Sequence, residues 1–276
     1  MAVAVADLSV TGARGRFAVR TWTPPSADGA TPLLLFHDSL GCIELWRDFP
    51  EALAVATRRT VIAYDRLGFG RSDPHPGQLD LDFIAAEARL SVPLLQQACG
   101  FETFVACGHS VGGGMAVEAA ARHADRCRAL ITLGAQAFVE DLTVRGIRDA
   151  RGGFETETGL AKLARYHGDK AEWALRAWVD TWLSPAFKDW SLADALGRVT
   201  CPVLAIHGAQ DPYGSRRHAD LIAGRGGTVE VLEDAGHFPH REAQQTVVKL
   251  ISTALSRWPC HVGIVTLTAH LTIMIS

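Results

Sequence analysis

The sequence lacks the features that set a protein apart from ordinary globular enzymes. Its six cysteines form no CxxC pair and no spacing typical of a zinc site, so we expect reduced thiols. No charge sign predominates, because 27 Lys and Arg face 30 Asp and Glu, for a formal net charge of −3. This balance does not favour nucleic acid or an anionic membrane as a partner. With 48% hydrophobic residues among 276, the chain has the length for one large core, which excludes a disordered chain or a collagen-like repeat.

Neither end of the chain carries a clear targeting signal. The N-terminus has no basic region before an apolar run, and Gly12 and Arg14 come early, so it is not typical of a signal peptide and we expect a cytoplasmic protein. The tail at 258–276 has no Asp, Glu, Lys or Arg, but it is short for a membrane span, which needs about 20 mostly apolar residues. The near alternation of apolar and polar residues in the tail favours a strand that pairs with a sheet edge or with another copy of the chain, although no oligomer is indicated.

Short β-branched runs alternate with longer helical stretches along the chain. This order predicts an α/β protein with a mostly parallel central sheet flanked by helices on both faces. The predicted strands are a hairpin of Val5–Thr11 and Arg16–Trp22, followed by Pro32–His37, Thr60–Asp65, Phe104–Gly108, Ala129–Gly134, Pro202–Gly208 and Thr228–Glu233. The predicted helices include Ile43–Thr57, Leu81–Cys99 with a kink at Pro93, Val111–His123 and Arg241–Ser256.

One connection is much longer than the others. About 60 residues separate the run that ends near Gly134 from the run that starts near Cys201, more than a simple connection needs. We therefore predict a helical cap at 135–199, inserted between core segments 1–134 and 200–257. The cap holds four of the seven tryptophans. We expect these rings either to pack the cap onto the core or to line an apolar substrate pocket, for which Trp178 and Trp182 are the candidates.

A serine lies in a G-x-S-x-G pattern between a predicted strand and a predicted helix. Gly108 and Gly112 flank Ser110 at a distance of two residues. Glycines are needed there because a nucleophilic serine occupies a sharp turn in which a Cβ at either position would collide. Such a turn raises the Ser110 hydroxyl above the sheet and points the N-terminus of the next helix at a developing oxyanion. The alternative is that Ser110 only caps that helix.

A nucleophilic serine needs an imidazole base and a carboxylate, and both follow later strands. Asp211 follows the Pro202–Gly208 run and His237 follows the Thr228–Glu233 run, so all three side chains fall at the carboxyl edge of the sheet. Asp211 would orient His237, which acts first as base and then as acid.

Two further residues compete for these roles. Asp234 is the alternative acid, but it lies too close to His237 in sequence, whereas Asp211 follows its strand at the expected loop. His240 is the alternative base, but it falls at the start of the last predicted helix, where we expect it to be exposed.

Three histidines, His37, His109 and His207, stand at the ends of predicted strands. Histidines at such positions more commonly pack in loops or orient neighbouring residues than bind a metal ion. We therefore expect no metal and no cofactor. Among the three, His109 directly precedes Ser110 and is a candidate substrate contact together with Asp38.

From Val5 to Ser256 the chain resembles serine hydrolases of the α/β-hydrolase fold. Besides the serine motif and the order of its partners, Tyr64-Asp-Arg-Leu-Gly-Phe-Gly-Arg-Ser72 is similar to the family's fourth-strand loop, interpreted as structural, and Phe36-His-Asp-Ser-Leu-Gly41 to its oxyanion segment. The resemblance implies an oxyanion hole formed by the backbone N–H groups of Ser39 and Val111. Asp38 stands where glycine is usual, and its carboxylate would repel an oxyanion unless it points away.

These observations predict acyl transfer through a covalent acyl-enzyme. A serine nucleophile disfavours epoxide opening and halide displacement, for which relatives use a carboxylate. We expect a carboxylesterase-like enzyme whose partner is a small, largely apolar acyl substrate. The alternatives are a carbon–carbon bond hydrolase or lactonase on the same triad, and a ligand receptor that keeps a slow triad and closes its lid on a partner.

Overall fold

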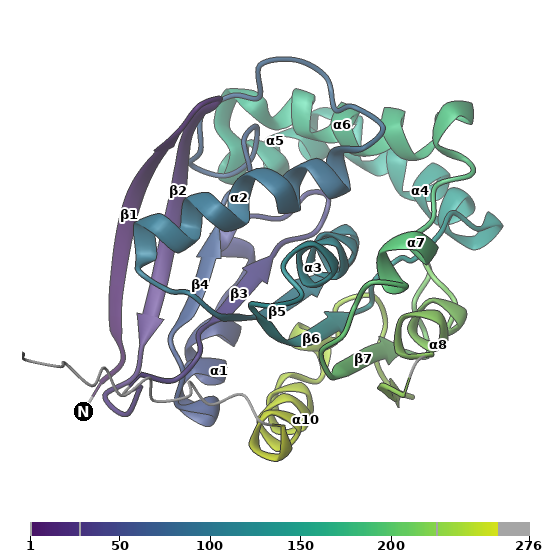
Figure 1. The fold of residues 1–276 in the computed structure, drawn as a ribbon. Coiled ribbons are helices and arrows are strands. Elements are labelled where there is room, and N and C mark those ends of the chain that lie inside the picture. The colour runs from purple at the N-terminus through teal and green to yellow at the C-terminus, as the bar shows by residue number, and fades with distance from the viewer. Residues whose placement is uncertain (1, 28, 225, 259–276) are drawn as a thin grey trace, which may run out of the picture.

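The computed structural model describes residues 2–27, 29–224 and 226–258, so the predictions for the tail, including Cys260, lie outside the described residues. Eight strands form one sheet in the order β1-β2-β4-β3-β5-β6-β7-β8, with antiparallel β1–β2 and β2–β4 pairs and parallel pairs elsewhere (Figure 1). This confirms the predicted mostly parallel sheet. The strands are β1 (Ala4–Gly12), β2 (Gly15–Thr23), β3 (Leu33–Phe36), β4 (Val61–Tyr64), β5 (Phe104–His109), β6 (Cys127–Leu133), β7 (Val203–Gly208) and β8 (Thr228–Leu232).

Helices cover both faces of the sheet. On one face α1 (Phe49–Thr57) packs beside α10 (Gln244–Arg257), and on the other α2 (Phe83–Cys99) packs beside α3 (Val111–Arg122); α8 (Arg217–Ala223) follows β7. Because successive residues of a strand point to opposite faces, β3 contributes alternate side chains to two separate apolar cores. The central strands β3 and β4 are therefore apolar and fully buried along their length, and the loops that follow them carry the polar side chains.

The segment between β6 and β7 is helical. It contains α4 (Asp141–Phe154), α5 (Glu157–His167), α6 (Ala171–Trp182) and α7 (Ala193–Leu196), with short 3₁₀ turns at Gly168–Lys170 (η2) and Pro185–Phe187 (η3). In Figure 1, α4, α5 and α6 gather at the opposite end of the molecule from α1 and α10. The division of the chain at 135 and 199 remains a prediction.

Two predicted helices are each broken in the structure. The stretch Ile43–Thr57 is a 3₁₀ turn (Ile43–Trp46, η1) followed by α1, because Arg47 adopts a positive φ of 56° and Pro50 lies in the first turn of α1. The stretch Arg241–Ser256 divides at Ala243, whose φ of −135° separates the short α9 (Pro239–Glu242) from α10.

The break before α10 overturns the prediction that His240 is exposed. Helix α9 begins at Pro239 and turns the imidazole of His240 inward, where it is 1% exposed. Its ring lies 4.6 Å from that of His109 and 5.0 Å from that of Trp46, measured between ring centroids. His240 is thus part of the packing beneath the site.

The loop after β4 is structural, as interpreted from sequence. The Asp65 carboxylate accepts hydrogen bonds from the backbone amides of Ile43 (2.6 Å) and Arg71 (2.7 Å), and the Ser72 hydroxyl donates to the Asp65 carbonyl. Through Ile43, Asp65 holds the end of the loop that follows β3.

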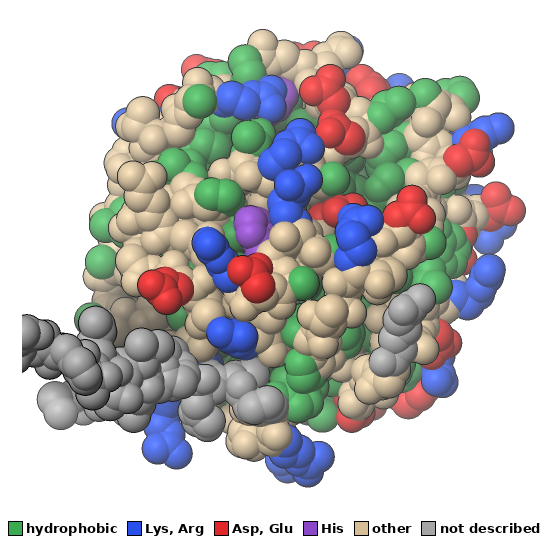
Figure 2. All heavy atoms as spheres, viewed as in Figure 1, with side chains coloured by type: hydrophobic (Ala, Val, Ile, Leu, Met, Phe, Trp, Pro, Cys, Tyr) green, Lys and Arg blue, Asp and Glu red, His purple; other side chains and the backbone are tan. Residues whose placement is uncertain are grey.

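The surface charge, the helices and the cysteines of the described residues can be compared with the sequence expectations. On the face that Figure 2 presents, basic and acidic side chains are interspersed. Within the described residues no helix is both long and apolar enough to cross a membrane. The five described cysteines are free thiols: Cys42, Cys99, Cys107, Cys127 and Cys201.

Candidate active site

Ser110 occupies a sharp turn between β5 and α3. Its backbone has φ 56° and ψ −127°, a strained conformation for a residue with a side chain. A Cβ on Gly108 would overlap the carbonyl oxygen of Gly112, and a Cβ on Gly112 would overlap that of Phe36. The Ser110 side chain makes no capping hydrogen bond to α3, so its geometry does not fit the N-cap alternative.

We predict that Gly108→Ala destabilises the fold by about 3 kcal/mol or more, because the added methyl meets rigid backbone. Differential scanning fluorimetry and denaturant titration measure the loss. The matched control is Gly152→Ala in α4, where a Cβ meets nothing within 4 Å and the change is expected to stabilise by up to about 1 kcal/mol. Equal stabilities of the two variants would contradict the steric explanation.

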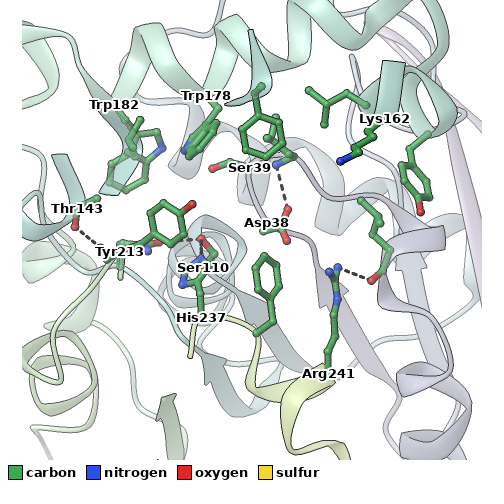
Figure 3. Close-up of a pocket in the computed structure, with 18 residues that line it drawn as sticks. Asp38, Ser39, Ser110, Thr143, Lys162, Trp178, Trp182, Tyr213, His237 and Arg241 are labelled. Carbon is green, nitrogen blue, oxygen red and sulfur yellow. Dashed lines mark hydrogen bonds between the residues drawn. The ribbon is translucent and has the colours of Figure 1, made fainter. Parts of the chain in front are cut away.

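The structure brings Ser110, His237 and Asp211 together (Figure 3). The Ser110 Oγ lies 3.0 Å from His237 Nε2, and His237 Nδ1 lies 2.8 Å from Asp211 Oδ2. All three side chains are buried, and they come from the loops after β5, β8 and β7. Asp234, the competing acid, is exposed. The geometry can therefore pass a proton from the serine hydroxyl to an imidazole whose other nitrogen faces a carboxylate.

Asp211 is held as a carboxylate. Burial acts to raise its pKa, but the hydrogen bond and charge of His237, together with the backbone amide of Tyr213, outweigh burial and lower the pKa below its usual value. The Tyr213 amide donates to Asp211 Oδ1 at 2.8 Å, which leaves Oδ2 directed at His237. This arrangement fixes the proton of His237 on Nδ1 and leaves Nε2 free to accept.

The predicted oxyanion donors lie on two sides of Ser110. Ser39 is in the loop after β3 and lines the cavity, while Val111 is the first residue of α3. Among the residues that the structure describes, neither backbone amide donates a hydrogen bond to another backbone group. Both amides are thus available to an oxyanion, as the first turn of a helix and the turn after a strand allow.

Asp38 lines the cavity, but its carboxylate oxygens are directed back into the protein. Oδ1 accepts the Leu40 amide at 3.1 Å, and Oδ2 lies 3.1 Å from His109 Nδ1. Burial acts to raise the pKa of Asp38, yet the hydrogen bond and charge of His109 and the charges of His37 and Arg241 outweigh it and hold the pKa well below its usual range. A Cβ on Gly41 would lie 2.7 Å from Oδ1, so this tight turn requires glycine.

His109 does not contact the cavity, contrary to its prediction as a substrate contact. It is 1% exposed, and its Nε2 lies 2.7 Å from the backbone carbonyl oxygen of His237. The other two strand-end histidines also meet loop backbone: His37 Nδ1 lies 2.8 Å from the Asp38 carbonyl oxygen, and His207 Nε2 lies 2.9 Å from that of Gly214. Each of the three therefore orients a loop.

A cavity of about 250 Å³ opens in front of Ser110 and His237. Trp178 and Trp182, both predicted, stand on one side, and Lys162 and Arg241 stand on the other (Figure 3). Most of its wall is apolar or aromatic, formed by Leu40, Leu45, Ile147, Phe154, Leu163, Tyr166, Trp178, Trp182, Tyr213 and Phe238. The other two tryptophans of the segment, Trp173 and Trp190, pack elsewhere.

Two residues that contact the triad were missed by the sequence analysis. The Ser110 hydroxyl donates to Gln136 Oε1 at 3.1 Å, and the Tyr213 ring lies 4.8 Å from that of His237. A hydroxyl has one proton, so the bond to Gln136 competes with the bond to His237. Gln136 could have been found as the first polar side chain after β6, the strand next to β5.

Comparisons with known proteins identify the family to which the chain belongs. Residues 31–244 match the family described as alpha/beta hydrolase fold. The human protein named serine hydrolase BPHL is 31% identical over 228 residues, which cover 78% of this chain and 76% of that protein. The solved structures that share the fold include a proline iminopeptidase from Mycobacterium smegmatis and an enol-lactonase from Burkholderia xenovorans LB400.

The structural matches extend over nearly the whole chain. The iminopeptidase has a TM-score of 0.70 at 22% identity and covers 91% of this chain and 98% of its own. The enol-lactonase has a TM-score of 0.69 at 20% identity and covers 91% of this chain and 100% of its own. The family match over residues 31–244 and the similarity to the human serine hydrolase confirm the predicted family: the chain belongs to the alpha/beta hydrolase family.

Proposed function

We propose that this protein is a serine hydrolase that cleaves carboxylic esters of small, largely apolar acyl groups through an acyl-enzyme. The observation that carries the proposal is the chain of contacts from Ser110 Oγ through His237 to Asp211, at 3.0 and 2.8 Å, opening onto an apolar cavity. Serine hydrolysis of an acyl group needs this order of nucleophile, base and carboxylate.

The roles follow from the positions of the groups. Ser110 Oγ attacks the ester carbonyl while its proton passes to His237 Nε2, and the carbonyl oxygen becomes an oxyanion beside the Ser39 and Val111 amides. The intermediate then expels the alkoxide, which takes the proton from His237 and leaves as the alcohol. Water attacks the acyl-enzyme by the same route, with His237 again as base, and releases the carboxylic acid and Ser110.

The cavity supports a small acyl group. Its volume of about 250 Å³ lies near the lower end of the range of small-molecule pockets, about 300–1,000 Å³. Burying an alkyl or aryl group against its apolar wall is favourable in free energy, because apolar surface is removed from water. An enol-lactone is a cyclic ester, so the activity named for the Burkholderia xenovorans structure belongs to the same chemistry.

A panel of p-nitrophenyl esters of increasing acyl length, a proline p-nitroanilide and an enol-lactone tests the reaction class. We expect the fastest turnover with short and medium esters. Faster cleavage of the anilide would contradict ester specificity. Covalent labelling of Ser110 with negligible turnover of every substrate would favour a slow receptor over an esterase.

We predict that Trp178→Ala shifts the acyl-length preference toward longer chains. Trp178 lies on the cavity side of α6, against Phe154 and Tyr213, and removing its ring lengthens the apolar space. The ratio of kcat/KM for a long ester to that for a short ester should rise about tenfold. Trp173→Ala is the control, since Trp173 is on the same helix but packs on Phe69 outside the cavity and should leave the ratio unchanged.

A further inference from the structure

His109 lies between the loop that carries Ser39 and the backbone of His237. Its Nε2 is 2.7 Å from the carbonyl oxygen of His237, and its Nδ1 is 3.1 Å from Asp38 Oδ2. Asp38 directly precedes Ser39, and His109 directly precedes Ser110. The ring therefore connects the three loops that hold the proposed oxyanion donor, the nucleophile and the base.

We propose that Asp38 and His109 share one proton. This neutral pair is a positioning unit that holds the loop carrying Ser39 in a fixed position relative to His237. A carbonyl oxygen only accepts hydrogen bonds, so the Nε2 that faces His237 must carry a hydrogen. Asp38 Oδ1 already accepts the Leu40 amide at 3.1 Å. Without a second proton, Oδ2 and Nδ1 would face each other as two acceptors in a buried site.

The shared proton has two arrangements with the same total charge. It lies either on Nδ1, which gives an imidazolium beside a carboxylate, or on Oδ2, which gives an imidazole beside a carboxylic acid. Both have a net charge of zero. Asp38 therefore adds no net negative charge beside the oxyanion hole, although a carboxylate alone would repel the oxyanion there.

Several basic groups also lie around the pair. Arg66 Nη2 donates to the Asp38 carbonyl at 2.8 Å, and the charge of Arg241 acts on the Asp38 carboxylate. His37 meets the Asp38 carbonyl, while His237 and His240 lie against the His109 ring with centroids 5.0 and 4.6 Å away. The charges of these groups disfavour a protonated Asp38, and among the described residues only His109 offers a donor to Oδ2.

The test uses six variants, with kcat and KM for a short p-nitrophenyl ester and the thermal midpoint measured for each. In Asp38→Asn, the amide oxygen can accept from Leu40 and the amide N–H can donate to a neutral His109, so kcat should stay within about tenfold of the parent. Asp38→Ala removes both bonds and should cost about a further tenfold in kcat. KM should change little, because the loss falls on the transition state.

His109→Gln gives the sharper outcome. It leaves Asp38 with no shared proton, and kcat should fall about 100-fold. Adding Asp38→Asn to His109→Gln removes the stranded charge and should restore about tenfold. His207→Gln is the matched control: it also replaces a buried histidine at a strand end, but its Nε2 meets Gly214, so adding Asp38→Asn to it should restore nothing.

The proposal rests on the proposed function for its effect on kcat, but the thermal midpoints test the shared proton without it. We expect the midpoint of His109→Gln to rise when Asp38→Asn is added. Additive losses in both midpoint and kcat, or an Asp38→Asn variant as slow as Asp38→Ala, would overturn the shared proton. If Ser110 fails to react with a fluorophosphonate, the proposed function fails, and the midpoints alone still decide whether the pair shares a proton.

Discussion

Replacing Ser110 by alanine is expected to reduce ester turnover by at least about 10⁴-fold, to the background rate. The hydroxyl is the group that the proposed reaction acylates, and no other hydroxyl lies at hydrogen-bond distance from His237 Nε2 among the described residues. Steady-state kinetics with a short p-nitrophenyl ester measures the loss.

The fold should survive this change. The Ser110 side chain caps no helix amide, and alanine meets the same backbone strain at φ 56° that serine already does. The thermal midpoint and circular dichroism spectrum should match the parent protein. A folded Ser110→Ala protein that keeps its rate would refute Ser110 as the nucleophile.

Asp211→Asn is expected to reduce kcat by about 10⁴-fold with the site otherwise intact. The asparagine oxygen can still accept the Tyr213 amide, as Oδ1 does at 2.8 Å. Its NH₂ group then faces His237 Nδ1, which must become an acceptor. The imidazole proton moves to Nε2, where it faces Ser110 and prevents the ring from acting as a base.

Asp234→Asn is the matched control, because Asp234 is an exposed acid three residues before His237. We expect it to keep nearly the parent rate. A normal rate for Asp211→Asn together with a large loss for Asp234→Asn would reverse the assignment of the acid.

Much of the site could be predicted because its residues stand next to strong local signals. Gly108 and Gly112 mark a turn that no other residue fits, and Asp211 and His237 each follow a buried strand whose edge is fixed by parallel pairing. Once the strands are recognised, the carboxyl edge brings these residues together without any knowledge of side-chain packing.

The rest depends on tertiary contacts that local patterns do not encode. His240 is buried because the separate helix α9 places its ring against those of His109 and Trp46. His109 contacts Asp38 and His237, which are 71 and 128 residues away from it in the sequence. Its absence from the cavity therefore could not be predicted from local patterns. Gln136 reaches Ser110 because β6 pairs with β5.

The most direct test of the central claim is mass spectrometry after treatment with a small fluorophosphonate, with the parent protein and Ser110→Ala run in parallel. We expect one adduct per chain, located on the peptide that contains Ser110, and no adduct on the variant. That result would establish Ser110 as an activated nucleophile. A folded parent protein that takes up no label, or takes it up at another residue, would contradict the assembled triad.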